Sequence, residues 1–239
     1  MEFNDPANIT EVASYDLAGE VSDSRLVGDI LYMVAGENGY CWHCSETPRT
    51  TVTSVSTGDL NDIQMVDQLS FESASGWYNM PIHVTPDRIY VASYEYETQR
   101  SDVQIVDISD PSGVMSLGAA VSLAGRIESR WQMSEYDGIF RTISQRGWSS
   151  QPPVVETFAV AQSNVLLPLG SLTMTLPRPE DLRSVRFDGT TAYAVTFEQI
   201  DPLFVIDLST PAAPLQRGAL EIPGWLQHME PRGDRMIAL

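Results

Sequence analysis

This 239-residue chain contains no lysine and no long hydrophobic run. All 14 basic residues are arginine and stand against 32 acidic residues, which gives a formal net charge of -18. Such a charge repels phosphate backbones and anionic lipids, so the composition argues against nucleic acid and anionic membrane as partners. Because no stretch of about 18 apolar residues occurs, we expect no direct membrane insertion by this chain.

Signatures of common catalytic sites are also missing. Histidine occurs only at positions 43, 83 and 228, and neither G-x-S-x-G nor H-E-x-x-H is present. Asp-rich turns at 57–64 and 107–113 offer oxygen ligands, but neither has the full spacing of a calcium loop. We therefore predict no metal site and no cofactor, with calcium as a weakly supported exception. A catalytic triad assembled in space stays open, without a motif to support it.

The only two cysteines, Cys41 and Cys44, form a C-x-x-C pair. Haem attachment would require His after Cys44, where Ser45 stands, and zinc would require a second pair of ligands. We predict a disulfide between Cys41 and Cys44 that closes a small loop in an oxidising compartment. Metal or redox work, with His43 as a further ligand, is the alternative.

Short alternating runs make up most of the remaining chain. Gly, Pro, Ser and Thr interrupt it about every ten residues, between runs such as TTVTSVST, DRIYVASY and TAYAVTF. Runs that end in a common position recur at spacings of 43, 48, 52 and 48 residues, with the reference residues Asp16, Asp59, Asp107, Ala159 and Asp207. A period of about 40 to 50 residues with about four short strands is typical of a β-propeller blade.

A second pattern gives the same period. RLVGDILYMV (25–34) and RFDGTTAYAV (186–195) share R-x-x-G-x-x-x-Y-x-V, and HVTPDRIYVA (83–92) keeps the frame. DISDP (107–111) and DLSTP (207–211) suit the turn that ends one strand and starts the next. We predict an all-β fold over 1–239: one β-propeller domain of about five four-stranded or incomplete blades, either a piece of a larger ring or a small irregular ring. The blades are expected near 21–72, 79–122, 126–172 and 182–222, with a partial blade at 225–239 that 9–17 would complete.

The repeat frame also predicts a ligand-binding ring. One residue per repeat stands at the start of the inner strand, or close to it in the longer third blade: Arg25, His83, Arg130, Arg186 and Glu230. Inner strands line the channel of a propeller, so alternation would point these side chains toward its axis. The arginines would then hold an anion or a carboxylate. The alternative is local pairing of Arg25 with Asp23 and of Arg130 with Glu128, which would hold adjacent blades together.

Five tryptophans offer a further candidate surface. They lie mostly at strand starts or in loops, and each either stacks against a sugar or partner loop or packs between blades: Trp42, Trp77, Trp131, Trp148 and Trp225. The sequence alone favours neither interpretation.

Three segments carry a resemblance to a known family: SYDLAGEVSDSRLVGDILYMV, GRIESRWQMSEYDGIFRTIS and RSVRFDGTTAYAVTFEQIDPLFVIDLSTPAAPLQRGALEIPG. They resemble secreted bacterial and archaeal proteins with a C-terminal β-propeller domain, a family whose activity is not established. The resemblance runs over most of 12–239 and is most specific over 183–224. It implies a propeller that is exported or anchored at a membrane. Members usually have a further blade before residue 12, continue beyond MIAL and carry His-Pro where this chain has Glu230-Pro231.

Together these features predict a binding or scaffold module rather than an enzyme. We expect it to be extracellular, periplasmic or on the cell surface, although MEFNDPANIT lacks the basic start and apolar stretch of a signal peptide. Its rim loops and channel mouth would hold a protein or a carbohydrate-like ligand. The alternative is a metal-assisted hydrolase or lyase with its site at the channel mouth.

Overall fold

The computed structural model describes residues 11, 14–37, 49–72, 80–147, 151–161, 165–197, 201–222, 229–232 and 235–238. Within these residues the strands form four four-stranded antiparallel sheets and one hairpin, and the single helical element is the 3-10 turn η1 (Arg130–Gln132). The predicted all-β propeller fold, with about five four-stranded or incomplete blades, is therefore confirmed. No helix in this described part is long and apolar enough to cross a membrane.

Each sheet is built from four strands that are consecutive in the sequence. The first sheet contains β1 (Glu20–Val27), β2 (Ile30–Glu37), β3 (Arg49–Ser56) and β4 (Gln64–Glu72), and the second contains β5 (Ile82–Val84), β6 (Arg88–Glu95), β7 (Arg100–Asp107) and β8 (Ser116–Ser122). The third contains β9 (Met133–Tyr136), β10 (Ile139–Ser144), β11 (Val154–Ala161) and β12 (Val165–Thr173), and the fourth contains β13 (Asp181–Asp188), β14 (Thr191–Phe197), β15 (Asp201–Asp207) and β16 (Leu215–Ile222). The hairpin consists of β17 (Met229–Arg232) and β18 (Arg235–Ala238). Of the segment 9–17 that would complete this last blade, residues 9, 10, 12 and 13 lie outside the described residues.

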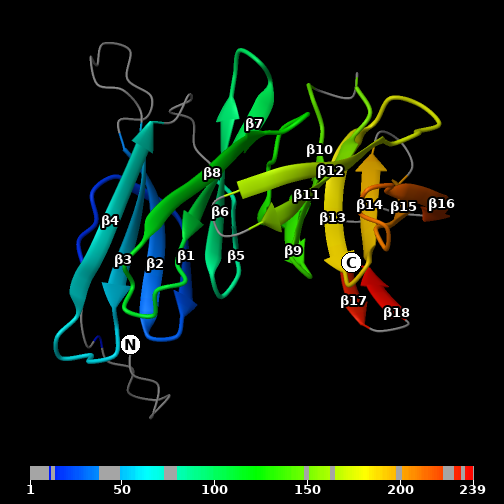
Figure 1. Ribbon diagram of the computed structural model, residues 1–239. Helices are drawn as coiled ribbons and strands as arrows, with labels where there is room; N and C mark the ends of the chain where they lie inside the picture. The colour runs from blue at the N-terminus through cyan, green and yellow to red at the C-terminus, as the bar shows by residue number, and fades with distance from the viewer. Residues whose placement is uncertain are drawn as a thin grey trace.

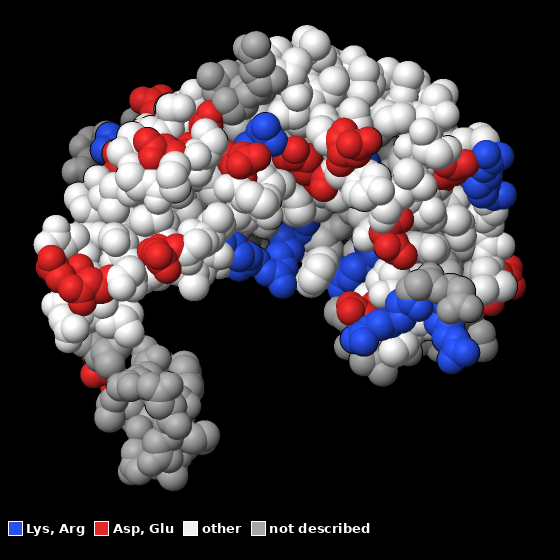
Figure 2. All heavy atoms as spheres, turned by 60° about the horizontal axis from the view of Figure 1, so that its bottom comes forward, with Lys and Arg blue, Asp and Glu red and all other residues white. Residues whose placement is uncertain are grey.

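The sheets follow one another side by side (Figure 1), and Figure 2 shows that they form an open arc around a hollow. Hydrophobic side chains fill the space between successive sheets. One cluster joins Ile30 of the first sheet to Val91 of the second, and the next contains Tyr90 stacked on Phe140 of the third sheet, with ring centroids 4.1 Å apart. Further clusters join Ile143 to Val185 and Val195 to Met229. Burying such a side chain fully contributes roughly 1.5–3 kcal/mol, so each sheet is stabilised mainly by its neighbours.

Glycines and Asx turns explain the repeated sequence patterns. Gly28 and Gly189 have φ of 59° and 51°, so the R-x-x-G pattern places a glycine where the hairpin turn requires a left-handed backbone. In the two turns that follow β7 and β15, the side chains of Asp107 and Asp207 accept hydrogen bonds from the N–H groups of Ser109 and Ser209. The turn interpretation of DISDP and DLSTP is thus confirmed.

Candidate functional site

Side chains of four inner strands, β1, β5, β9 and β13, line a cleft of about 280 Å³ in the hollow of the arc. Arginine side chains gather in this hollow, whereas acidic side chains are spread over the outer surface (Figure 2). The cleft brings together four of the five predicted ring residues, together with one tryptophan: Arg25, His83, Arg130, Arg186 and Trp131. That these side chains bind a ligand stays a prediction.

Strand register explains why these side chains reach the same cleft. Arg25 pairs with Tyr32 across β1 and β2, and Arg186 pairs with Tyr193 across β13 and β14. Each arginine lies two residues before the end of its inner strand, and the predicted position at the strand start is wrong because both strands begin five residues earlier. The two arginines still point the same way relative to the turn. Repeating blades therefore carry equivalent side chains to one place.

Arg130 reaches the cleft differently, from η1 rather than from an inner strand. A capping box holds this 3-10 turn: Ser129 Oγ accepts the N–H of Trp131 at 3.1 Å, and Gln132 Oε1 accepts the N–H of Ser129 at 3.0 Å. The inserted turn thus supplies a positive charge that the third inner strand itself does not carry.

Arg25 makes the local ion pair that the sequence offered as the alternative. Its Nη1 contacts Asp23 Oδ1 and donates to the carbonyl of Ser24. Both partners lie on β1, so this pair does not join adjacent blades. Arg25 Nη2 is buried and has no hydrogen-bond partner among the described residues.

Glu128 and Arg130 each contact another side chain. Glu128 forms an ion pair with Arg126, at 3.1 Å between Oε1 and Nη1. The guanidinium carbon of Arg130 lies 4.6 Å from the centroid of the Trp131 indole. The pairing of Arg130 with Glu128 stays a prediction.

Trp131 also contacts Arg186, the most buried arginine of the cleft. The Arg186 guanidinium carbon lies 3.9 Å from the Trp131 centroid, and the residue is only 6% exposed. Arg186 Nη1 donates to the carbonyl of Val185 at 2.6 Å. Two cation–π contacts thus hold guanidinium groups against one indole ring. Trp131 positions charge in this structure, a role the sequence did not predict.

Arg186 differs from Arg25 in its nearest acidic group. Ser184 occupies the strand position at which β1 has Asp23. Burial lowers the pKa of Arg186, and the negative charge of Glu230 on β17 opposes this shift. Glu230 therefore lies close enough to act on Arg186, but it does not belong to the lining of the cleft.

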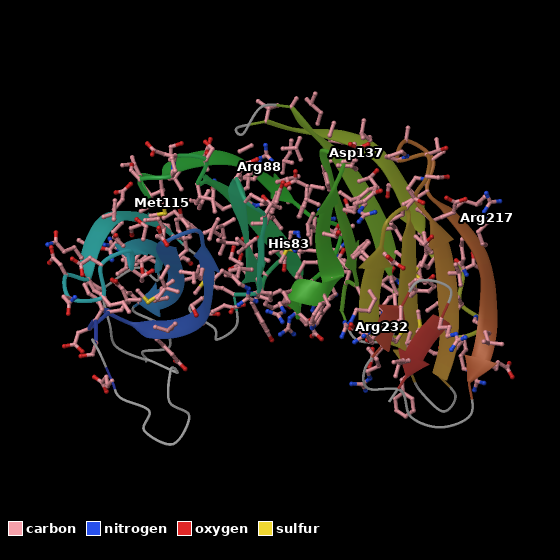
Figure 3. All side chains as sticks on the ribbon, turned by 90° about the horizontal axis from the view of Figure 1, so that it is seen from below. His83, Arg88, Met115, Asp137, Arg217 and Arg232 are labelled. Carbon is pink, nitrogen blue, oxygen red and sulfur yellow. The ribbon has the colours of Figure 1, made fainter. Side chains whose placement is uncertain are left out.

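His83 links the second and third sheets. Its Nε2 accepts the backbone N–H of Glu135 at 3.1 Å, and the Glu135 carboxylate accepts from Arg88 Nη1 at 2.8 Å and from the Tyr90 hydroxyl at 2.7 Å. Figure 3 shows His83 in the middle of the arc. Burial lowers the pKa of His83 to about 4, aided by the charges of Arg141 and Arg25 and opposed by that of Glu135. His83 is therefore neutral at pH 7 and adds no positive charge to the cleft.

Arg141 is a buried charge beside the cleft that sequence reasoning missed. It is 3% exposed, donates through Nη2 to Ser134 Oγ at 2.7 Å and donates through Nη1 to the carbonyl of Gly189 in the fourth sheet. Burial lowers its pKa to about 10. The repeat frame contained a signal for Arg141. In the second repeat His83 pairs with Tyr90, whereas in the third repeat the pair is Ser134 with Arg141. The third repeat therefore carries its cation on the second strand of the blade.

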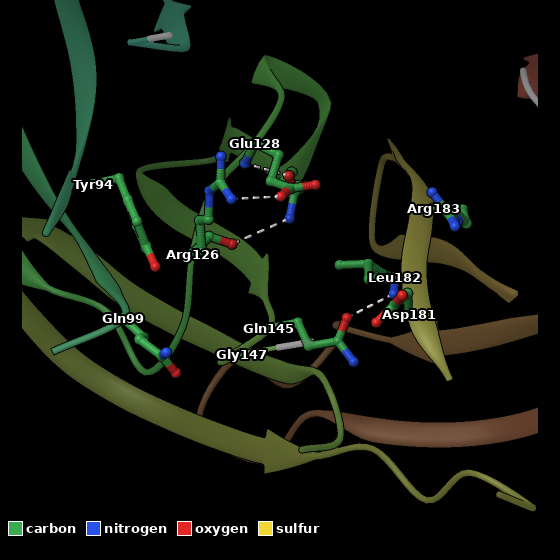
Figure 4. A pocket seen from close by; sticks show the side chains of 10 residues that line it. Tyr94, Gln99, Arg126, Glu128, Gln145, Gly147, Asp181, Leu182 and Arg183 are labelled. Carbon is green, nitrogen blue, oxygen red and sulfur yellow. Dashed lines mark hydrogen bonds and ion pairs between the residues drawn. The ribbon is translucent and has the colours of Figure 1, made fainter. Parts of the chain in front are cut away.

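Two further hollows extend the cleft along β13. The first, of about 370 Å³, shares Trp131 and Arg186 with the cleft. The second, of about 60 Å³ (Figure 4), shares Gln132 and Arg183 with the first. Together they form one groove between η1 and β13.

Among the described residues, no group of three or more His, Cys, Asp or Glu side chains is placed to hold a metal ion. Cys41, Cys44 and His43 lie outside the described residues, so the predicted disulfide and its alternatives stay predictions. The same holds for four of the tryptophans: Trp42, Trp77, Trp148 and Trp225.

Comparison with known proteins points to the fold. The sequence model of a family described as "Beta propeller domain" matches residues 35–238. An uncharacterised protein of Methanocaldococcus jannaschii is 33% identical over 116 residues, which cover 48% of this chain and 18% of that protein. An uncharacterised protein of Archaeoglobus fulgidus is 32% identical over 108 residues, covering 45% of this chain and 16% of that protein. The chain therefore matches less than a fifth of the length of either relative.

Solved structures share only distant similarity. A protein from Lactobacillus plantarum gives a TM-score of 0.47 at 16% identity, covering 82% of this chain and 54% of that one. The β-propeller domain of the trilobed protease from Pyrococcus furiosus gives 0.45 at 8% identity, covering 87% and 58%.

Proposed function

Because the chain belongs to the β-propeller domain family, we propose that it is a binding module whose arginine-lined cleft holds a ligand with a carboxylate group. One observation carries the proposal: Arg25, Arg130 and Arg186 line a single cleft in a chain with a net charge of -18. Concentrating like charges costs free energy, so an arrangement of this kind is expected where an anion is bound.

The state of Arg25 supports an oxygen-bearing ligand. Its buried Nη2 has no acceptor among the described residues, and leaving such a group unsatisfied costs about 1–3 kcal/mol. A carboxylate oxygen that reached Nη2 from the cleft would satisfy it, and a guanidinium can hold a carboxylate through two parallel hydrogen bonds.

The position of the cleft strengthens these interactions. Charges in a hollow with protein walls are screened less than charges on an open surface. Each charge-assisted hydrogen bond contributes roughly 1.5–3 kcal/mol. The acidic outer surface slows the approach of anions, so specificity would come from contacts in the cleft rather than from long-range attraction.

We further propose that the module works outside the cytoplasm, at the cell surface or in the periplasm. The resemblance of residues 183–224 to exported propellers supports this location. The partner would be a protein or a carbohydrate-like molecule that carries a carboxylate. Detection of the native protein in extracytoplasmic fractions would support the location, and its confinement to the cytoplasm would overturn it.

Calorimetric titration with succinate tests the proposed function. The chain should bind succinate, and Arg25→Gln and Arg130→Gln should each weaken binding about tenfold or more, since each removes a charge-assisted contact. Arg217→Gln is the matched control, because Arg217 lies on β16, is 60% exposed and pairs with Asp207 (Figure 3). If succinate does not bind, or if all three variants weaken binding equally, the proposal is wrong.

A further inference from the structure

The groove along β13 is longer than a small carboxylate requires. It begins at the cleft around Arg25 and Arg130, continues past Trp131 and ends near Asp181 and Tyr94. A dicarboxylate such as succinate would fill only the part nearest to Arg25. The remaining groove indicates that the ligand is extended.

Five consecutive residues of β13, 182–186, line the middle hollow of this groove. Side chains of a strand alternate between its two faces, so neighbouring residues cannot all point into one hollow from a single face. The groove must therefore run along the edge of β13. Within the described residues β13 pairs only with β14, so its other edge is not covered by a strand.

Side chains close two points of this edge. The N–H of Leu182 donates to Gln145 Oε1 at 2.6 Å (Figure 4), and the carbonyl of Val185 accepts from Arg186 Nη1 at 2.6 Å. Another main chain can bond to the edge between these two points, and it would replace the side chain at either point. A free strand edge of this kind is the surface that binds an extended peptide by strand addition.

The charge of the groove is opposite to that of the whole chain. Five arginines and two acidic residues line its three hollows, whereas the whole chain has 14 basic and 32 acidic residues. The arginines are Arg25, Arg126, Arg130, Arg183 and Arg186. Arg126 is paired with Glu128 and Arg25 with Asp23, and the lining still contains more cations than carboxylates. Charge complementarity therefore favours an acidic ligand.

A β-bulge places Arg183 in this groove. The register of β13 against β14 shifts between Leu182 and Ser184, which makes Arg183 the extra residue. Bulges change the direction of a side chain and bend the strand locally. In β1 the equivalent extra residue is Ser22, which bonds to the backbone of Met80, so Arg183 replaces a small packing residue by a long cation.

We propose that the ligand of this groove is an extended acidic peptide that lies along the free edge of β13. This inference rests on the proposed function. One carboxylate binds at Arg25, Arg130 and Arg186, a second lies over Arg183, and the peptide main chain bonds to the edge between them. Strands rise about 3.4 Å per residue, so residues 182–186 span about 14 Å and accommodate four to five peptide residues.

Peptide length gives the first test. Capped glutamate peptides of two, four and six residues are titrated into the chain, with succinate as the small reference ligand. Affinity should rise at least tenfold from two residues to four and change less than threefold from four to six. Arg183→Gln should weaken the six-residue peptide at least fivefold and leave succinate unchanged, whereas Arg25→Gln should weaken both.

Main-chain recognition gives the second test. Two glutamate hexapeptides are N-methylated at alternate amides, one at the odd and one at the even positions. Each keeps the charge of the unmethylated hexapeptide but lacks half of its N–H donors. One of the two should bind at least tenfold more weakly than the unmethylated peptide. A galacturonate hexamer of equal charge should bind more weakly than the peptide. If succinate binds while length and N-methylation have no effect, or if the galacturonate hexamer binds more tightly, this inference is wrong and the proposed function stands. If succinate fails to bind, the proposed function fails first.

Discussion

Protonation of His83 should destabilise the chain in a defined pH range. The folded structure uses His83 Nε2 as an acceptor for the N–H of Glu135, and burial lowers the pKa from 6.5 to about 4. Between these two values the unfolded chain binds a proton at this site and the folded chain does not. The free energy of unfolding therefore increases with pH through this range. The contribution of neutral His83 is lost as the pH falls from about 6.5 to about 4.

The size of this effect follows from the two pKa values. They differ by about 2.5, and each pKa unit corresponds to about 1.4 kcal/mol, which gives about 3.5 kcal/mol at most. The ring of His83 is partly exposed, so solvent screening reduces the expected loss to about 1–2 kcal/mol. The charged groups that surround it are Glu135 on β9, Arg141 on β10 and Arg25 on β1.

Urea denaturation at pH 7.5 and pH 4.5 measures the effect, with His83→Gln as the control. Glutamine can accept the hydrogen bond from the Glu135 N–H but does not titrate. The variant therefore lacks the pH dependence of stability that comes from His83 and keeps the pH dependence that comes from carboxyl groups. The wild-type chain should lose about 1–2 kcal/mol more than the variant between the two pH values. Equal losses would show that His83 is not held neutral by the fold.

Three further predictions concern packing between sheets and charge in the cleft. Glu135→Ala should lower the free energy of unfolding by about 3–5 kcal/mol in urea denaturation, because it leaves the largely buried Arg88 unpaired. Glu135→Gln should lower it less, and equal effects of the two variants would contradict the ion-pair explanation. Gly170→Ala should destabilise the fold by at least about 1–3 kcal/mol, since a Cβ there would lie 2.5 Å from the carbonyl oxygen of Pro211. In Gly218→Ala the new Cβ would meet no atom within 4 Å, so this control should be nearly neutral. Thermal denaturation compares the two variants, and similar melting temperatures would refute this reasoning. Asp23→Asn should tighten succinate binding in calorimetry, because it removes the carboxylate that competes for Arg25, and weaker binding would argue against a direct role of Arg25.

The sequence predicted the fold and the structural equivalence of Arg25 and Arg186 because both depend on the repeat. Period and strand alternation fix which residue of each blade faces the hollow, and both can be read without knowing any long-range contact. The position of Arg186 against Tyr193 follows from its pattern, just as that of Arg25 against Tyr32 does.

The contacts of these residues could not be predicted in the same way. His83 meets Glu135 across 52 residues of sequence, and no local pattern specifies that meeting. Trp131 holds Arg130 and Arg186 because a short inserted turn carries it to the fourth sheet, which departs from the repeat frame. The sequence repeat thus predicts which side chains are equivalent in successive blades. The contacts that these side chains make with an inserted turn or a neighbouring sheet depend on tertiary packing.

Trp131 provides the most direct test of the central claim that the arginine cleft binds a carboxylate. Its indole N–H resonance is measured in the nitrogen-15-labelled chain during titration with succinate and is assigned with Trp131→Phe. We predict that this resonance shifts more than those of the other four tryptophans and that Arg25→Gln abolishes the shift. An unchanged Trp131 resonance at saturating succinate, or a shift confined to other tryptophans, would contradict the account.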